Sequence, residues 1–360
     1  MSRNAFSELP QISALIALTL IEGLTHFGLL YPDSGAYLAN VGFFQGSSAP
    51  NQFRLLRPIV PFLVSLVGRF MDLRTAFAVV NLLFWCGSAV VMLSFVRRLT
   101  HKGDVALLSS GFLLVAYPML VYGDAVLTDM AGFFFVLVGV DLIVNWKVLS
   151  LSYANVLAGG GIMTVGILSR ETVACVFVLA LIWVIISRES FVKLILFVGI
   201  PMAALFAWAT VERLSLLGFV LVQQTYSSRY QPLSWSGRIL TWLYTLRIAF
   251  RPELLLLAFV GLVFALRKKD WVKYAVIICG ISAFLLAVPG PVDYRFTFLL
   301  YPAILPLAAI GTIQLARLIS EQITVSQAKN TTILLTALVF LAYAAETNWL
   351  ALKFVSIPFG

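Results

Sequence analysis

The sequence predicts an all-α membrane protein, a polytopic bundle of about 11 transmembrane helices, and two observations indicate it. Hydrophobic residues make up 61% of the 360 residues and charged residues only 11%, and the mean hydropathy is +0.98. A soluble domain has a much larger charged fraction. The apolar residues also form continuous runs, whereas a β-barrel would need short strands of alternating polarity.

The apolar runs follow one another without a repeat or a low-complexity tract. The first run is longer than the core of a signal peptide and has no cleavage site behind it, so we expect a retained first helix. We expect a single transmembrane domain over residues 1–360, with no soluble domain at either end. The predicted helices cover roughly residues 11–30, 74–96, 105–122, 130–146, 154–168, 172–187, 191–211, 253–266, 272–289, 296–316 and 332–350.

Lysine residues orient the predicted bundle, because loops rich in basic residues usually lie in the cytoplasm. The pattern predicts an integral protein of the plasma (inner) membrane with a cytoplasmic N-terminus. The outer loops are then residues 31–73, 123–129, 169–171, 212–252 and 289–295. The residues that occupy the alternate, cytoplasmic loops are Arg97, Arg98, Lys102, Lys147, Arg188, Lys193, Arg267, Lys268, Lys269, Lys273, Arg317 and Lys329.

Two outer loops are long, and each holds a segment typical of an interfacial helix. The first contains RPIVPFLVSLVG (57–68), an apolar piece too short to span the bilayer. The fourth contains RILTWLYTLRIAFR (238–251), in which tryptophan and tyrosine are interspersed with arginine. Such a composition favours a helix that lies at the level of the lipid headgroups.

The basic residues of the predicted outer side are arginines, apart from Lys353 after the last helix. Arginine holds phosphate oxygens through two parallel hydrogen bonds and stays charged at a partly dehydrated surface. We therefore expect an outer phosphate site, although single arginines could instead reach toward lipid headgroups. The outer arginines are Arg54, Arg57, Arg69, Arg74, Arg170, Arg213, Arg229, Arg238, Arg247, Arg251 and Arg295.

The first helix carries ionisable residues that lead toward the outer side. Glu22 and His26 are four residues apart, and Asp33 is seven beyond His26, so a continuing helix would place all three on one face. Two simpler readings stay open. Glu22 and His26 could satisfy each other inside the bundle, and Asp33 could cap a helix that starts at DSGAYL.

Charged residues at four outer turns are candidates for substrate binding, although most have a local explanation as well. Asp129 could cap the fourth helix, Arg170 could pair with Glu171, and Asp293 could pair with Arg295. Charges this close to the membrane are costly and often functional. The candidate substrate-binding residues are Arg57, Asp124, Asp129, Arg170, Glu171, Arg251, Asp293 and Arg295.

The sequence indicates neither a disulfide nor a metal centre. Cys86, Cys175 and Cys279 each lie in an apolar segment, and no histidine cluster accompanies them. We expect no cofactor, although two outer aspartates could hold a hydrated cation. The formal net charge is +9. Because the basic residues are divided between the loops on the two sides of the membrane, this charge does not indicate nucleic-acid binding.

The order of short motifs resembles the GT-C class of polytopic glycosyltransferases, which includes protein O-mannosyltransferases and aminoarabinose transferases of lipid A. The matching pieces are DSGAY with Asp33 and Tyr37, then RPIVPFL, LTD before the fourth helix, LSRET after the fifth, and DYRFTFLLYPAILP. The resemblance covers about the whole chain in order and topology. This chain has one acidic residue at Asp33 instead of an adjacent acidic pair, and it is shorter than most members.

The resemblance implies an inverting transfer of a sugar from a polyprenyl-phosphate donor to a hydroxyl of a lipid, glycan or protein acceptor, on the extracytoplasmic side. It also implies that Asp33, in the first outer loop, is the catalytic base that takes the proton of the acceptor hydroxyl. Fixed cations would stabilise the leaving phosphate. Arg170 and Arg295 are the first choices for this role, followed by Arg57 and Arg251.

Three other functions stay open on the sequence. A secondary transporter would place ionisable groups near the middle of the bilayer, where this chain offers Glu22, His26 and Asp141. A polymerase, ligase or phosphotransferase that uses the same polyprenyl carriers would also need outer arginines. A non-catalytic scaffold would need none of these charged turns.

Overall fold

A computed structural model describes residues 5–26, 30–31, 33–212, 234–267, 271–287, 298–322 and 328–355. In these ranges the regular secondary structure is helical, with no strand. Five helices are long and apolar enough to cross a membrane: 73–100, 191–211, 235–267, 298–321 and 329–353. The all-α class and the membrane-spanning character are confirmed, whereas the number of about 11 spans stays a prediction.

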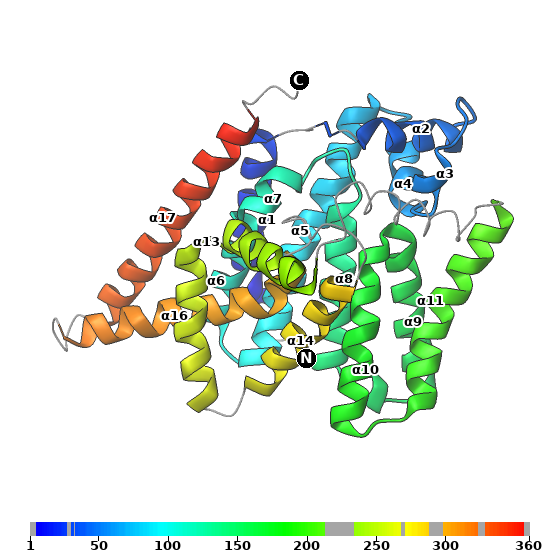
Figure 1. The fold of residues 1–360 in the computed structure, drawn as a ribbon. Helices are drawn as coiled ribbons and strands as arrows, with labels where there is room; N and C mark the ends of the chain where they lie inside the picture. Colours follow the sequence, from blue (N-terminus) through cyan, green and yellow to red (C-terminus); the bar gives the residue numbers. More distant parts are fainter. Residues whose placement is uncertain are drawn as a thin grey trace.

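The first part of the chain builds one end of the molecule and several helices that run away from it. Helices α2, α3 and α4 lie together at the upper end in Figure 1. The elements are α1 (Ala5–Thr25), α2 (Ser34–Phe44), α3 (Gln52–Leu55), α4 (Ile59–Val67), α5 (Leu73–Thr100), α6 (Gly103–Leu114), α7 (Tyr117–Tyr122), α8 (Asp129–Val144) and η1 (Val148–Ser150).

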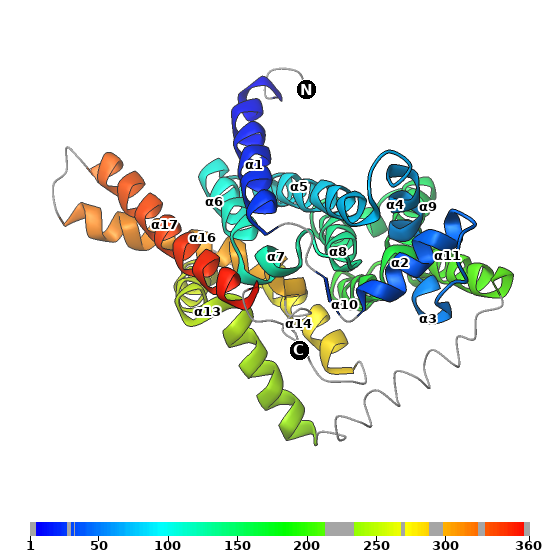
Figure 2. The same ribbon diagram turned by 90° about the horizontal axis from the view of Figure 1, so that it is seen from above.

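The second part supplies two groups of helices on either side of α5 and α8, as the view from above shows (Figure 2). One group is formed by α9, α10 and α11, and the other by α13, α16 and α17. The elements are α9 (Tyr153–Ser169), η2 (Glu171–Ala174), α10 (Cys175–Ser187), α11 (Phe191–Val211), α13 (Trp235–Arg267), α14 (Trp271–Ala287), η3 (Phe298–Leu300), α16 (Tyr301–Glu321) and α17 (Ala328–Val355).

The predicted helix over residues 105–122 is wrong, because the structure divides it into α6 and α7. The break lies at Val115 and Ala116, and Pro118 follows in the first turn of α7. A proline ring excludes the preceding turn from regular helix and favours a helix start. The chain then continues without helix from Gly123 to Thr128 and enters α8.

The first helix ends earlier than its apolar run suggests. Helix α1 stops at Thr25, and Asp33 precedes α2 as its N-cap residue. Asp33 therefore does not continue the face that carries Glu22 and His26. Glu22 contacts the last helix instead, since Asn348 of α17 donates a hydrogen bond to Glu22 Oε1 at 3.2 Å.

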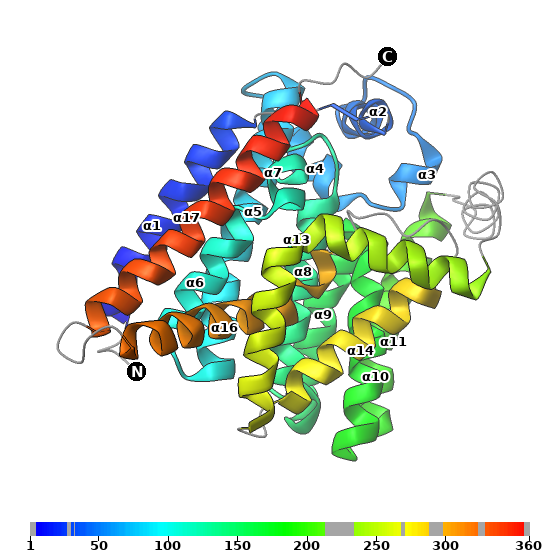
Figure 3. The same ribbon diagram turned by 60° about the vertical axis from the view of Figure 1, so that its left-hand side comes forward.

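Helix α13 consists of two straight parts joined at Arg251. Arg251 has φ 57° and ψ 145°, and Pro252 follows it, so the helical hydrogen-bond ladder is interrupted. The two parts point in different directions in Figure 3. The part after the bend matches the predicted span 253–266, and the part before it contains the segment for which we predict an interfacial position.

Helices α13 and α16 touch backbone to backbone, where two glycines face each other's helices. A Cβ atom placed on Gly261 would lie 1.8 Å from the carbonyl oxygen of Leu307, and one on Gly311 would lie 1.9 Å from that of Leu257. No side chain fits into such a contact. Close approach of helices through small residues is typical of membrane proteins.

Replacing Gly261 with alanine is therefore expected to lower the free energy of unfolding by about 1–3 kcal/mol, because α13 and α16 must move apart. The matched control is Gly199→Ala in α11, where an added Cβ meets nothing within 4 Å. The free energy of unfolding of both variants is measured in detergent, by heating or by titration with a denaturant. Equal stability of the two variants would contradict the close contact.

Candidate active site

Eight polar residues from four chain segments form one connected cluster, which we call the arginine–carboxylate cluster. The segments are the start of α2, the turn around α3, the start of α8 and the junction between α9 and η2. Three arginines face three carboxylates in it, so their formal charges cancel. The members are Asp33, Tyr37, Arg54, Arg57, Thr128, Asp129, Arg170 and Glu171.

Asp33 and Arg54 form a partly exposed ion pair at the edge of the cluster, where the side chain of Glu171 is 37% exposed as well. Arg54 Nη2 lies 2.6 Å from Asp33 Oδ2, and their side chains are 23% and 32% exposed. Asp33 is the N-cap residue of α2, but its side chain makes no capping hydrogen bond. Within the described ranges, the contact of its carboxylate is the one from Oδ2 to Arg54.

Arg57 links Tyr37 to Glu171. Its Nε donates to Glu171 Oε2 at 2.5 Å, Nη2 donates to the second oxygen of the same carboxylate, and Nη1 donates to the hydroxyl of Tyr37. Burial, the largest single influence, lowers the pKa of Arg57, but the charges and hydrogen bonds of Glu171 and Tyr37 together outweigh it, and the pKa is raised. Burial raises the pKa of Glu171, whereas Arg57 and Arg170 lower it to about 2. Both groups therefore stay charged.

Arg170 and Asp129 form a second pair that is almost entirely buried. Arg170 Nη1 donates to Asp129 Oδ2 at 2.9 Å, and Nη2 lies 2.8 Å from Oδ1, with side-chain exposures of 4% and 1%. Arg170 Nη1 also donates to Thr128 Oγ1 at 3.0 Å. Because Thr128 Oγ1 donates to the hydroxyl of Tyr37 at 3.3 Å, the two ion pairs belong to one network.

The close approach of Arg170 to α8 depends on Gly132. A Cβ atom on Gly132 would lie 2.8 Å from Cβ of Arg170 and 3.1 Å from Oγ1 of Thr172. Any larger residue would push the α9–η2 junction away from α8. The small residue one turn after Asp129 therefore lets the Arg170 side chain reach back to Asp129.

The segment 123–128 holds the start of α2 in place. Asn81 of α5 donates from Nδ2 to the carbonyl oxygens of Ala125 at 2.5 Å and Leu127 at 3.0 Å. Ser34 Oγ donates to the carbonyl oxygen of Val126 at 3.0 Å. Asp33 is therefore positioned by its chain neighbour Ser34, and Asp124, which is 1% exposed, lies in the same segment.

The structure brings together five of the predicted site residues, namely Asp33, Arg57, Asp129, Arg170 and Glu171. The local explanations are wrong for three of them. Arg170 and Glu171 pair with Asp129 and Arg57, far away in sequence, instead of with each other. Asp129 is not a cap, because Thr128 occupies the N-cap position of α8 and no side-chain capping bond forms.

Four predicted site residues are not part of this cluster. Asp124 is buried in the segment 123–128, close to it in sequence. Arg251 pairs with Glu346 of α17 at the bend of α13. Asp293 and Arg295 lie outside the described residues. The role of each in substrate binding stays a prediction.

Arg54, Thr128 and Asn81 were not among the predicted site residues. The sequence offered a signal for Arg54, because it lies three residues before Arg57 in the first outer loop. In the structure, its guanidinium lies 5.7 Å from the ring centroid of Tyr37. Thr128 belongs to the LTD motif. Asn81 carried no signal, because one polar residue inside a long apolar helix indicates no partner.

Replacing Tyr37 with phenylalanine is expected to lower the free energy of unfolding by about 1–3 kcal/mol, because Arg57 and Thr128 lose a shared buried acceptor. Tyr37 is fully buried. The matched control is Tyr153→Phe in α9, where the side chain is 53% exposed and the expected change is within about 0.5 kcal/mol. An equally small change for Tyr37→Phe would contradict the role of the hydroxyl.

The described part of the chain contains no group of three or more His, Cys, Asp or Glu side chains arranged to hold a metal ion. In the arginine–carboxylate cluster, both oxygens of Asp129 and of Glu171 are directed at arginine nitrogens. Arginine already supplies the positive charge that a cation would bring to these carboxylates.

Comparison with known proteins gives matches to solved structures. No protein-family model matches the chain, and no curated protein matches it in sequence. The structure of ArnT from Cupriavidus metallidurans matches with a TM-score of 0.66 over 97% of this chain and 76% of that one, at 14% identity. The oligosaccharyltransferase of Archaeoglobus fulgidus, tethered to an acceptor peptide, matches with a TM-score of 0.59 over 96% of this chain, at 11% identity.

The chain has the GT-C fold. A further structure of the archaeal oligosaccharyltransferase AglB, in complex with an inhibitory peptide and a dolichol-phosphate, matches with a TM-score of 0.56 at 11% identity. The chain spans 55% of the tethered oligosaccharyltransferase and 56% of the complex with dolichol-phosphate. The predicted resemblance is therefore confirmed at the level of the fold, and the chain is an integral membrane protein.

Proposed function

We propose that the protein is a membrane glycosyltransferase that moves a sugar from a polyprenyl-phosphate donor to an acceptor hydroxyl on the extracytoplasmic side. Inversion at the anomeric carbon follows from a single displacement by the acceptor. The acceptor is a lipid, a glycan or a protein. The GT-C fold supports this class, since ArnT and the oligosaccharyltransferase are transferases of this fold.

The observation that carries the proposal is the state of Asp33. A general base needs a carboxylate oxygen that can receive the proton of the acceptor hydroxyl. Both oxygens of Glu171 accept hydrogen bonds from Arg57. Asp129 is only 1% exposed, with Oδ2 accepting from Arg170 Nη1 and Oδ1 2.8 Å from Nη2. Asp33 has one oxygen against Arg54 and is 32% exposed, so its carboxylate is placed to receive a proton from a bound acceptor.

The arginines divide into two roles in this proposal. Arg57 and Arg170 are buried and hold Tyr37, Thr128 and their partner carboxylates, so they shape the floor of the site. Arg54 is 23% exposed beside Asp33 and is the cation of the cluster best placed to meet the leaving phosphate. Arg251 and Arg295 complete the phosphate contacts, and Asp124 and Asp293 contribute to substrate binding.

The test is sugar transfer by the purified protein in nanodiscs, supplied with a panel of labelled polyprenyl-phosphate sugars and a total membrane lipid extract as acceptor source. Consumption of one donor, with release of polyprenyl phosphate, is expected. If a folded preparation consumes none of the donors, the proposal is overturned, and lipid-phosphate transfer without a sugar or substrate transport becomes the better explanation. Stereochemistry of the product, measured by nuclear magnetic resonance, tests inversion.

A further inference from the structure

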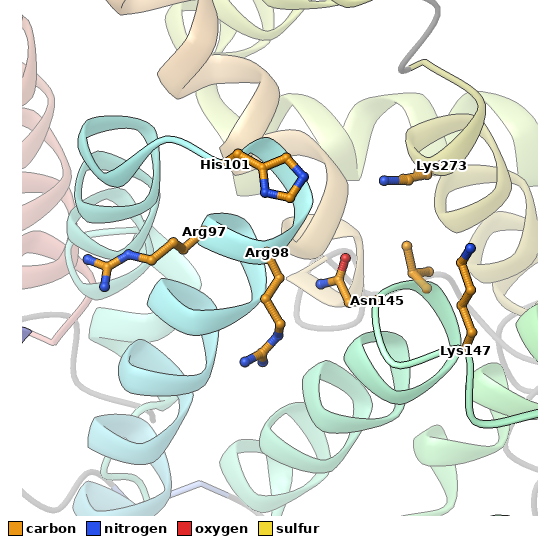
Figure 4. Close-up of a pocket in the computed structure, with 7 residues that line it drawn as sticks. Arg97, Arg98, His101, Asn145, Lys147 and Lys273 are labelled. Atoms are coloured by element: carbon orange, nitrogen blue, oxygen red, sulfur yellow. The ribbon is translucent and has the colours of Figure 1, made fainter. Parts of the chain in front are cut away.

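The end of the bundle away from the arginine–carboxylate cluster contains a second polar feature, a cavity of about 480 Å³. Cavities that bind small ligands have volumes of about 300–1,000 Å³. Figure 4 shows basic side chains from three elements around it. The cavity is lined by Arg97, Arg98, His101, Asn145, Lys147 and Lys273.

This cavity is distinct from the candidate active site. Helix α8 begins at Asp129, in the cluster, and ends at Val144, beside the cavity. Sixteen residues separate Asp129 from Asn145, which corresponds to about 24 Å along a helix. The cavity and the candidate active site therefore lie near opposite faces of the membrane core, with the cavity on the side that the lysines mark as cytoplasmic.

The cavity carries an excess of positive charge. Arg98 pairs with Asp141, which also accepts hydrogen bonds from Asn145 at 2.8 Å and from Trp146 Nε1 at 3.2 Å. The Arg97 side chain points away from the other labelled residues in Figure 4 and donates to Gln11 Oε1 at 2.6 Å. Within the described ranges, neither Lys147 nor Lys273 contacts a carboxylate, so these two lysines bring positive charge to the cavity.

Two residues at the cavity have a backbone conformation that side chains rarely adopt. His101 has φ 57° and Lys147 has φ 47°, which is the left-handed region that glycine normally occupies at the end of a helix. His101 ends α5 in this way. Glycine would adopt this conformation without strain at both positions, so the local backbone does not itself require a basic side chain there.

Aromatic residues place the cavity at the level of the lipid headgroups. Trp146 and Tyr153 are each 53% exposed, and Trp271 is 41% exposed, and all three are near the cavity in sequence. Tryptophan and tyrosine concentrate where the apolar core of the membrane meets water. The Arg98 guanidinium lies 5.4 Å from the Trp146 ring centroid, so cation and aromatic ring form one surface there.

We propose that this cavity binds the phosphate group of an anionic phospholipid of the cytoplasmic leaflet. Lys147, Lys273 and the basic C-terminal end of α5 hold this phosphate group. Basic pockets between helices on the cytoplasmic side suit phospholipid headgroups. A headgroup at the aromatic level reaches the cavity without leaving the membrane, whereas a soluble phosphate would have to displace it. The inference is independent of the proposed glycosyl transfer.

The test is native mass spectrometry of the detergent-solubilised protein titrated with phosphatidylglycerol or with zwitterionic phosphatidylcholine. The test variant combines Lys147→Asn with Lys273→Gln, since asparagine tolerates the left-handed conformation. The matched control, Lys193→Gln with Lys329→Gln, removes the same charge from lysines that do not line the cavity. The test variant is expected to lose affinity for phosphatidylglycerol by about tenfold or more, and the control less than about twofold.

Equal losses in the two double variants, or no preference of the wild type for phosphatidylglycerol, would overturn the proposal. Matching size-exclusion profiles and melting temperatures establish that both variants are folded. If the double variant does not fold, Lys273→Gln alone, on the side of α14, provides the same comparison against Lys193→Gln. Inorganic phosphate distinguishes the source of the ligand: failure to displace bound phosphatidylglycerol supports a lipid site, and tight binding of phosphate with no lipid preference contradicts it.

Discussion

Replacing Asp33 with asparagine is expected to reduce the rate of sugar transfer by a factor of about 10²–10⁴, the usual contribution of a general base. Asparagine has nearly the same size and keeps an oxygen beside Arg54, but it cannot take up the proton of the acceptor hydroxyl. Because Asp33 is partly exposed and makes no capping bond, the variant is expected to fold normally. Donor turnover in nanodiscs measures the effect.

The matched control is Asp72→Asn. Asp72 is another aspartate in the predicted first outer loop, and its Oδ1 accepts a hydrogen bond from the backbone N–H of Thr75 at 3.0 Å as the N-cap of α5. Asparagine caps a helix about as well as aspartate, so transfer by this variant should equal that of the wild type. Full activity in Asp33→Asn would remove the assignment of the base, and equal loss in both variants would indicate a general effect of charge.

Replacing Arg170 with methionine is expected to lower the free energy of unfolding by about 3–5 kcal/mol, because Asp129 would be left as a buried charge without a partner. Both side chains are at most 4% exposed. The double variant Arg170→Met with Asp129→Leu removes both charges and should recover most of the loss. Unfolding in detergent, measured for both single variants and the double variant, completes the cycle.

Arg54→Met is the control for this cycle, because it makes the same substitution in the more exposed pair of the same cluster. Surface ion pairs contribute about 0–1 kcal/mol, so its effect on stability should be small. A similar loss for Arg54→Met and Arg170→Met would contradict the distinction between a buried floor and an accessible edge. No recovery in the double variant would show that Arg170 stabilises the fold through packing instead of through its pair.

Much of the candidate site could be predicted, because charged residues are rare in this chain and each one near the membrane must be satisfied. Asp33, Arg57, Asp129, Arg170 and Glu171 were recognised from charge and motif order. Their partners were not, since pairing depends on which chain segments meet in space. Arg170 lies next to Glu171 in the chain, yet its hydrogen-bonding partner is Asp129, 41 residues away.

The sequence by itself determined the fold class and the side of the membrane on which each charge is expected. Both follow from local properties: the length of an apolar run sets whether it can span, and the choice of arginine or lysine reflects its surroundings. The tertiary structure alone decided which carboxylate pairs with which arginine. That outcome depends on close contacts between distant helices, such as Arg170 against Gly132, and uniformly apolar helices carry no periodic pattern from which such contacts could be read.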